Sequence, residues 1–142
     1  MPQKYVKKIL DARIYDLAVE TPVDAAPLLS QRLNNEILLK REDLQPVFSF
    51  KLRGAYNKLR QLSKAQLEAG VIAASAGNHA QGLALAAQKM GVKATIVMPI
   101  TTPKIKVDAV RGWGANVVLF GDNYDAAAGH ANELIEQHGM TY

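Results

Sequence analysis

A lysine set between two large apolar residues is the strongest chemical signal in this sequence. Lys51 lies between Phe50 and Leu52 in the stretch 49–55 (SFKLRGA). Apolar residues then recur at helical spacing, and Ser49 is of a type that caps helices, so a helix is predicted to begin near Phe50. The helix dipole and the apolar neighbours, which predict partial desolvation, both favour a neutral amine. A positioned neutral amine suits Schiff-base chemistry, although a lysine taken alone is more often a solvated surface residue.

A second candidate site is the polar loop 75–79 (SAGNH), which follows a short apolar stretch. Ser75 offers a hydroxyl group, Gly77 gives flexibility, and a helix start offers free backbone N–H groups, so the loop suits a carboxylate or a phosphate. The loop is equally consistent with a plain strand-to-helix turn in which Asn78 caps the helix. His79 taken alone is more typical of a capping or packing histidine than of a catalytic one.

The elements around these two stretches predict an α/β fold. Short apolar stretches near Ile37, Ile72, Ile96 and Val118 predict about four strands, and the segments between them predict helices. Continuous apolar strands that alternate with helices indicate a parallel sheet with helices on both faces. Ligands of such sheets bind at the carboxyl ends of the strands, where both candidate sites and the loop 99–103 are expected.

Local signals place several ends of these elements. A helix is predicted over residues 1–14 from its apolar face, and Ser63 with Gln66 has the pattern of a capping box at the start of another. Asp122 or Asn123 is expected to cap the last helix. The final three residues predict the opening of a further strand, so we expect the sequence to be a segment of a longer protein.

Composition narrows the classes of protein to which the chain could belong. With 142 residues, 49% of them hydrophobic, and a net charge of +4, it suits one soluble domain. Its lysines and arginines are scattered, which argues against nucleic-acid binding. It has no cysteine, and neither His130 nor His138 has partners spaced as metal ligands. No stretch is long enough to cross a membrane, and the N-terminus lacks the apolar run of a signal peptide. The absence of cysteine is compatible with a reducing cytoplasm. We expect a cytoplasmic protein with no metal, membrane or nucleic-acid partner.

Three motifs make the sequence recognisable as a relative of a known family. The stretches 40–43 (KRED), 45–56 (QPVFSFKLRGAY) and 75–82 (SAGNHAQG) resemble the threonine dehydratases, pyridoxal-phosphate enzymes also called threonine deaminases or threonine ammonia-lyases. The likeness is closest to the biosynthetic type and extends over essentially the whole chain. It implies that residues 36–142 form the small lobe of a fold-type II enzyme, with the tryptophan-synthase-β-like fold. Residues 1–35 are then expected to form an N-terminal arm that packs on a large lobe outside this chain.

The resemblance also assigns roles to residues of both candidate sites. Lys51 matches the lysine that forms a Schiff base with pyridoxal 5'-phosphate, Phe50 matches the aromatic residue beside the cofactor ring, and Asn78 matches the asparagine that hydrogen-bonds the ring hydroxyl. The loop that holds the substrate carboxylate is matched by Ser75, Ala76, Gly77, Asn78 and His79.

These roles imply the deamination of L-threonine, with L-serine as an alternative substrate, to a 2-oxo acid and ammonia. For L-threonine the product is 2-oxobutanoate, in the first step of isoleucine biosynthesis, and the enzyme is expected to be a homo-oligomer. The amine of Lys51, once displaced by the substrate amine, takes the Cα proton, with the cofactor ring as electron sink. Related serine racemases carry a second serine where this chain has Ala76, so elimination is favoured over racemisation.

One part of the family's cofactor site is missing from the sequence. The family holds the cofactor phosphate with a glycine-rich loop later in the chain, and no such glycine run occurs here. We therefore expect this segment alone to be inactive. Two other interpretations stay open, namely a catabolic serine/threonine dehydratase of the same fold and a non-catalytic α/β module that binds a small anion or a protein partner.

Overall fold

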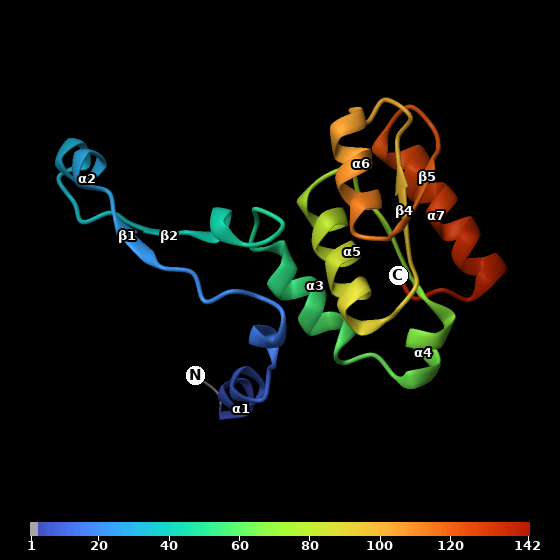
Figure 1. Cartoon of the computed structure of the whole chain (residues 1–142), viewed down its shortest axis with the longest axis horizontal. Helices are drawn as coiled ribbons and strands as arrows, with labels where there is room; N and C mark the ends of the chain where they lie inside the picture. Colours follow the sequence, from blue (N-terminus) through green and yellow to red (C-terminus); the bar gives the residue numbers. More distant parts are fainter. Residues whose placement is uncertain (1–2) are drawn as a thin grey trace.

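Three parallel strands form the central sheet of the protein in a computed structural model that describes residues 3–142 (Figure 1). The order is β3 (Val71–Ala74), β4 (Ala94–Met98) and β5 (Asn116–Leu119), so each strand pairs with its neighbour in the sequence. Beyond β3, Thr141 forms a parallel bridge with Val71. The parallel sheet is therefore confirmed, with strands at three of the four predicted places and the chain end beginning a fourth position.

Helices cover both faces of this sheet, as the sequence predicts. One face packs against α3 (Lys51–Leu59), α5 (Asn78–Met90) and α6 (Lys104–Gly112), and the other packs against α7 (Tyr124–His138). A short helix, α4 (Lys64–Ala69), lies between α3 and β3 in the chain. Within residues 3–142, no helix combines the length and the apolar character that a bilayer crossing requires.

The alternation of side chains along the strands divides the core into two layers. Ala73, Ile96 and Met98 pack with α3, α5 and α6, whereas Ile72 and Val97 pack with α7. Successive strand residues point to opposite faces, so a strand covered on both faces is apolar at every position. The central part of the sequence has this continuous apolar character because its sheet lies between two helical layers.

Two helix starts follow the local signals of the sequence. Ser63 Oγ accepts a hydrogen bond from the N–H of Gln66 at 3.3 Å, and the Ser63 N–H donates to Gln66 Oε1 at 2.9 Å, which confirms the capping box. Asn123 Oδ1 accepts from the N–H of Ala126 at 3.0 Å and caps α7. These polar caps satisfy N–H groups that have no partner within their own helices.

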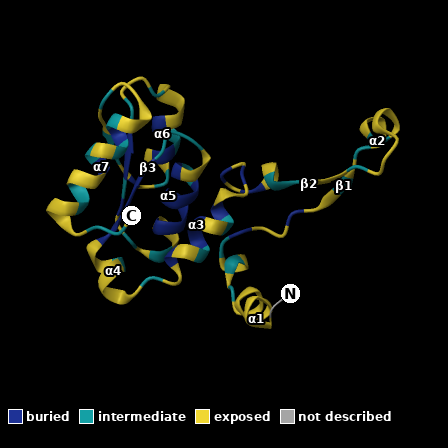
Figure 2. Cartoon of the chain, turned by 180° about the vertical axis from the view of Figure 1, so that it is seen from behind, coloured by how far each residue is buried: buried dark blue, intermediate teal, exposed yellow. Residues whose placement is uncertain are grey.

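Residues 3–44 form an arm that projects from the α/β body (Figures 1 and 2). Most of the arm is exposed, in contrast to the buried strands of the body (Figure 2). Its elements are α1 (Gln3–Leu10), the 3-10 helix η1 (Ile14–Asp16), β1 (Val23–Ala25), α2 (Pro27–Leu33), β2 (Leu38–Lys40) and the 3-10 helix η2 (Glu42–Leu44).

The strand expected near Ile37 belongs to this arm, so its prediction as a buried member of the parallel sheet was wrong. It is β2, which pairs antiparallel with β1 and places Leu39 opposite Asp24. All of β2 is exposed because the ribbon stands away from the body (Figure 2). An apolar run indicates a strand but not the surface that covers it. The first helix is also shorter than predicted, since α1 ends at Leu10, and residues 1–2 lie outside the described part.

Helices α3 and α5 pack very close together at Gly82. A Cβ atom on Gly82 would lie 3.1 Å from the backbone nitrogen of Leu52 and 3.1 Å from the carbonyl carbon of Lys51. Both neighbours are backbone atoms, so no flexible side chain can move aside to make room. The missing side chain at Gly82 therefore sets the distance between α5 and the first turn of α3.

A larger residue at this contact is expected to destabilise the protein. Gly82→Val should lower the free energy of unfolding by about 1–3 kcal/mol, because the added atoms force the two helices apart. In the control Gly129→Ala, on α7, the new methyl group meets no atom within 4 Å. Alanine is the better helix former, so the control should gain up to about 1 kcal/mol. Urea unfolding followed by Trp113 fluorescence measures the free energy of unfolding of both variants. An unchanged value for Gly82→Val would contradict a tight contact at Gly82.

Candidate active site

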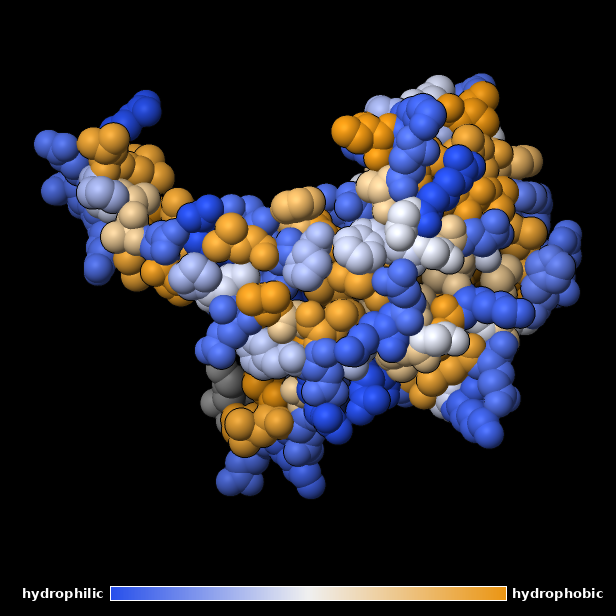
Figure 3. Space-filling view, viewed as in Figure 1, coloured by the Kyte–Doolittle hydropathy of each residue, from blue (hydrophilic) through white to orange (hydrophobic). Residues whose placement is uncertain are grey.

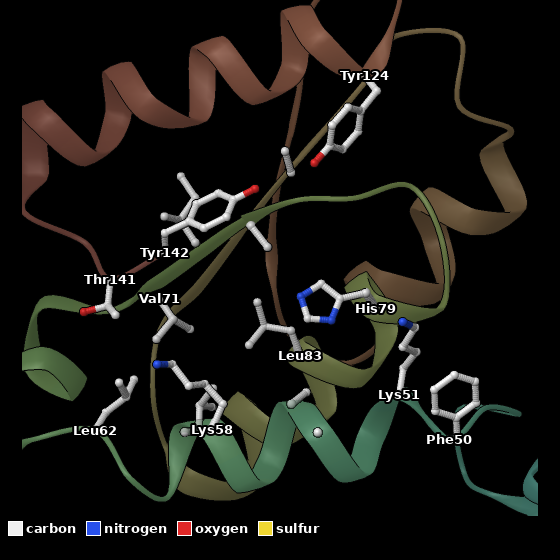
Figure 4. A pocket seen from close by; sticks show the side chains of 16 residues that line it. Phe50, Lys51, Lys58, Leu62, Val71, His79, Leu83, Tyr124, Thr141 and Tyr142 are labelled. Carbon is white, nitrogen blue, oxygen red and sulfur yellow. The ribbon is translucent and has the colours of Figure 1, made fainter.

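An open pocket of about 470 Å³ lies between α3, β3 and the first turns of α5 and α7 (Figure 4). Lys51, Phe50 and His79 lie at one end of it, and Tyr124 and Tyr142 face it from the opposite side (Figure 4). Among the described residues that line the pocket, none has a carboxylate side chain, whereas Lys51 and Lys58 each bring an amine. The charged side chains of the lining are therefore positive, and they favour an anion.

Lys51 is the first residue of α3 and brings its amine to the pocket. Its N–H donates to Ser49 Oγ at 3.2 Å, so Ser49 supports the helix start although Phe50 holds the N-cap position. The Nζ atom lies 5.1 Å from the centre of the Phe50 ring, within the range of a cation–π contact. Phe50 and Lys51 thus form one end of the pocket.

The partial desolvation predicted for Lys51 is absent from the chain as described. Lys51 is exposed, and Phe50 is 59% exposed, whereas Leu52 is fully buried. Successive residues of a helix point about 100° apart, so only Leu52 of the three turns toward the core. Of the two apolar neighbours of Lys51, only Leu52 is therefore buried in the core, while Phe50 stays exposed.

The loop 75–79 joins the end of β3 to the start of α5. Gly77 is the N-cap of α5, Asn78 is its first residue, and no side chain of the described residues caps it. The alternative in which Asn78 caps the helix is therefore wrong. The N–H of Gly77 donates to Ser75 Oγ at 3.4 Å, which folds the serine back over the loop. Uncapped N–H groups at a helix start favour an anion in front of them.

The pocket brings together only some of the residues that the sequence singled out. Lys51, Phe50 and His79 line it, whereas the four residues before His79 in the loop lie outside its lining. Those four, expected to contact the substrate or the cofactor ring, are half-buried or exposed beside the pocket: Ser75, Ala76, Gly77 and Asn78.

His79 lines the pocket and has a shifted pKa. Its pKa lies below the ordinary value of 6.5, chiefly because the pocket wall desolvates the ring and secondly because Lys51 is positively charged. A lowered pKa keeps the imidazole neutral at pH 7. His79 can therefore donate or accept a hydrogen bond beside Lys51 without adding a second full charge.

Three pocket residues were not identified as site residues from the sequence. Lys58 lies about two turns after Lys51 on the same side of α3, so it lines the pocket while remaining exposed. Tyr124 begins α7 at the carboxyl end of β5, and the sheet-edge rule could have located it. Partial desolvation, and next the nearby hydroxyl group of Tyr124, raises the pKa of Tyr142 above its usual value, although its side chain stays largely exposed. No sequence signal linked Tyr142 to the pocket.

His130 takes part in contacts away from the pocket, and His138 is the last residue of α7. His130 stacks on Phe120 with 4.0 Å between ring centres, and its Nδ1 lies 2.8 Å from Glu133 Oε2. Across residues 3–142 there is no group of three or more side chains arranged to hold a metal ion.

A comparison with known families decides the assignment of the chain. Residues 14–142 match the family described as "Pyridoxal-phosphate dependent enzyme". The chain belongs to this family. The fold-type II expectation agrees with its structural relatives, since the processed form of threonine deaminase isoform 2 from Solanum lycopersicum has a TM-score of 0.93 and 54% sequence identity. That superposition covers 99% of this chain and 39% of the tomato structure.

Curated relatives show the same likeness at the level of sequence. The chain is 57% identical over 139 residues to threonine dehydratase 1, biosynthetic and chloroplastic, from Solanum lycopersicum, covering 98% of this chain and 23% of that protein. It is 53% identical over 139 residues to the biosynthetic L-threonine dehydratase of Escherichia coli, covering 98% of this chain and 27% of that protein. The chain thus spans about a quarter of the length of these relatives.

The electrostatic link between His79 and Lys51 can be measured directly. Lys51→Met removes the positive charge and keeps a side chain of similar length, so the pKa of His79 should rise. It should stay below 6.5, because desolvation, the larger cause, remains. An NMR titration of the His79 ring in both proteins measures the change. Identical titration curves would show that the Lys51 amine does not act on His79.

Proposed function

We propose that the chain is the N-terminal segment of the catalytic domain of a threonine ammonia-lyase. Its reaction is the pyridoxal-phosphate-dependent deamination of L-threonine to 2-oxobutanoate and ammonia. The observation that carries the proposal is the position of Lys51, which begins α3 in a positively charged pocket next to His79. The relatives named threonine dehydratase and threonine deaminase support the choice of substrate.

The residues around Lys51 fit a planar aldehyde that carries negative charge. Lys51 would hold the aldehyde carbon of pyridoxal 5'-phosphate through Nζ, with the ring of Phe50 beside it and Asn78 bound to the ring hydroxyl. The absence of carboxylate side chains among the described lining residues suits an anionic cofactor. When bound, the cofactor supplies the electron sink for the carbanion at the Cα atom of the substrate.

The loop before α5 would hold the substrate. Its uncapped helix N-terminus and the Ser75 hydroxyl favour the substrate carboxylate, and the neutral His79 ring borders the same space. The Nζ atom of Lys51 would take the Cα proton as a general base. The methyl group of Ala76 can neither accept nor donate a proton, so Ala76 offers no second base to Cα, which favours elimination over racemisation.

Other parts of the proposal rest on residues outside this chain. The sequence contains no glycine run to hold the cofactor phosphate, so a complete site needs further residues. We infer that this segment alone does not turn over threonine and that the complete enzyme is a homo-oligomer. We also infer that it acts in isoleucine biosynthesis in the cytoplasm, without nucleic-acid partners, whereas its tomato relative is named as chloroplastic.

The arm is the part of this chain that would contact the large lobe, which lies outside the chain. We propose that residues 1–35 pack on the large lobe and that residues 36–142 form the small lobe. Apolar side chains are exposed along the arm (Figure 3), and they support this, with Leu28 83% exposed and Leu33 55% exposed. The antiparallel ribbon pairs residues from both sides of the proposed boundary, so β2 follows the arm rather than the body.

Removing the amine of Lys51 tests the proposed chemistry. In an enzyme of the relatives' full length, Lys51→Ala should lower kcat/KM for L-threonine by about 10³-fold or more, because the cofactor anchor and the base are lost together. Production of 2-oxobutanoate measures it. Lys89→Ala, at the exposed end of α5, is the matched control and should retain activity. Lys58 lines the pocket and is unsuitable as a control.

Several outcomes of this assay separate the interpretations. Normal turnover without Lys51 would remove it from the mechanism. Preference for L-serine over L-threonine would favour a catabolic dehydratase. A full-length protein without lyase activity would favour a non-catalytic module, and clear Lys51-dependent turnover by the 142-residue chain would show that it binds the phosphate by itself.

A charge introduced on the arm by substitution tests whether the surface of the arm is covered in the full-length enzyme. In the 142-residue chain, Leu28→Asp should change the free energy of unfolding by less than about 0.5 kcal/mol, because Leu28 is 83% exposed. In the full-length enzyme the same change should lower the melting temperature clearly, because the large lobe would bury the carboxylate. Ala65→Asp, on exposed α4, should be neutral in both proteins. An unaffected full-length enzyme would contradict the packing of the arm.

A further inference from the structure

Behind the first turn of α3, one carboxylate collects four hydrogen bonds. Glu42, in η2, accepts from Arg53 Nε and from the terminal NH2 nitrogen of Arg53, each at 2.8 Å. It also accepts from Thr21 Oγ1 at 2.6 Å and from Gln45 Nε2 at 3.2 Å. The Glu42 and Arg53 side chains are only 16% and 21% exposed. A carboxylate this well satisfied stays ionised, and its pKa falls to about 2, chiefly through Arg53.

Arg53 and Gln45 extend this network into the arm. Arg53 donates to the Val19 carbonyl oxygen at 3.2 Å and lies 5.3 Å over the Tyr15 ring. Gln45 is 1% exposed and exchanges two hydrogen bonds with the Val19 backbone, at 2.9 and 2.8 Å. These contacts connect one side of the start of α3 to η1, to Val19 in the segment before β1, and to η2.

The network acts on the turn that carries Lys51. Arg53 follows Lys51 by two residues, so the two side chains point about 160° apart around the helix. Lys51 faces the pocket, and Arg53 faces η2 and the arm. Between them, the Leu52 backbone is pressed against Gly82 of α5. The turn is held by packing on one side and by charge-assisted hydrogen bonds on the other, which together fix its rotation.

We propose that Glu42 and Arg53 are a positioning pair that fixes the rotation of the first turn of α3 and so aims the Lys51 amine at the pocket. This inference rests on the proposed function for its catalytic meaning. Neither residue lines the pocket or touches the reacting groups, so both act through Lys51. The guanidinium group is needed for its fork of parallel donors, which an ammonium group cannot reproduce.

Conservative variants of the 142-residue chain test the pair. Glu42→Gln keeps the shape and removes the charge, and Arg53→Lys keeps the charge and removes the fork. Each should speed hydrogen exchange of the backbone over residues 51–56 by about tenfold, because the turn opens more often. Exchange in α7 should not change. The double variant should be no worse than the worse single variant, since the two groups act as one unit.

Two further readouts separate positioning from plain stability. If the Lys51 amine swings away, the pKa of His79, which Lys51 helps to lower, should rise in the NMR titration. Trapping with pyridoxal 5'-phosphate and cyanoborohydride, followed by peptide mapping, should show less labelling of Lys51 relative to Lys89. The matched control is Glu68→Gln, whose exposed ion pair with Lys64 spans 3.7 Å and should affect none of these measurements.

Each outcome gives a definite answer. Unchanged exchange over residues 51–56, or faster exchange with an unmoved His79 titration, overturns the positioning role. Normal turnover of L-threonine by a Lys51→Ala enzyme of the relatives' full length refutes the proposed function, while exchange and titration in the 142-residue chain still decide the role of the pair. Circular dichroism establishes that each variant is folded, and if Glu42→Gln does not fold, Arg53→Lys carries the test.

Discussion

The approach of two helix backbones at Gly82 is the constraint on which the site depends. Lys51 is the first residue of α3, and the loop 75–79 leads into α5. The distance between these helices therefore sets the distance between the Lys51 amine and this loop. Helices usually pack 8–10 Å apart, depending on the side chains at the contact. Here the side chain is missing at Gly82, and buried alanines such as Ala80 and Ala84 continue the small surface of α5. Small residues in a core helix thus have a positional role, beyond filling space.

The amine of Lys51 is exposed on the pocket side of α3, where water reaches it. No described residue of the lining places a carboxylate side chain beside it. On the far side of α3, the charges of Glu42 and Arg53 are paired with each other and do not face the pocket. The ion pair that holds α3 and the amine of Lys51 therefore lie on opposite sides of one helix.

The sequence predicted those features that depend on neighbours along the chain. Ser63 and Asn123 cap the helices that they were expected to cap, because a cap needs only residues within one turn. The strand near Ile37 failed because its place depends on pairing with β1 and on the absence of cover, neither of which is local. Lys51 was found by its neighbours and by resemblance, but its exposure depends on how α3 is rotated. The pairing of Glu42 with Arg53 was not predicted, since they lie eleven positions apart in different elements and no local pattern links them.

The strand order of the sheet bears on how the protein is made. β3, β4 and β5 pair strictly in sequence order, so each new strand docks on the one that has just emerged. These pairings join residues 21–23 positions apart, as in Val71 with Ala94 and Thr95 with Asn116, whereas the bridge of Val71 with Thr141 spans 70 positions. Closing the longer loop costs more chain entropy, so the three strands can pair before the chain end joins them. The exposed leucines of the arm take no part in this sheet.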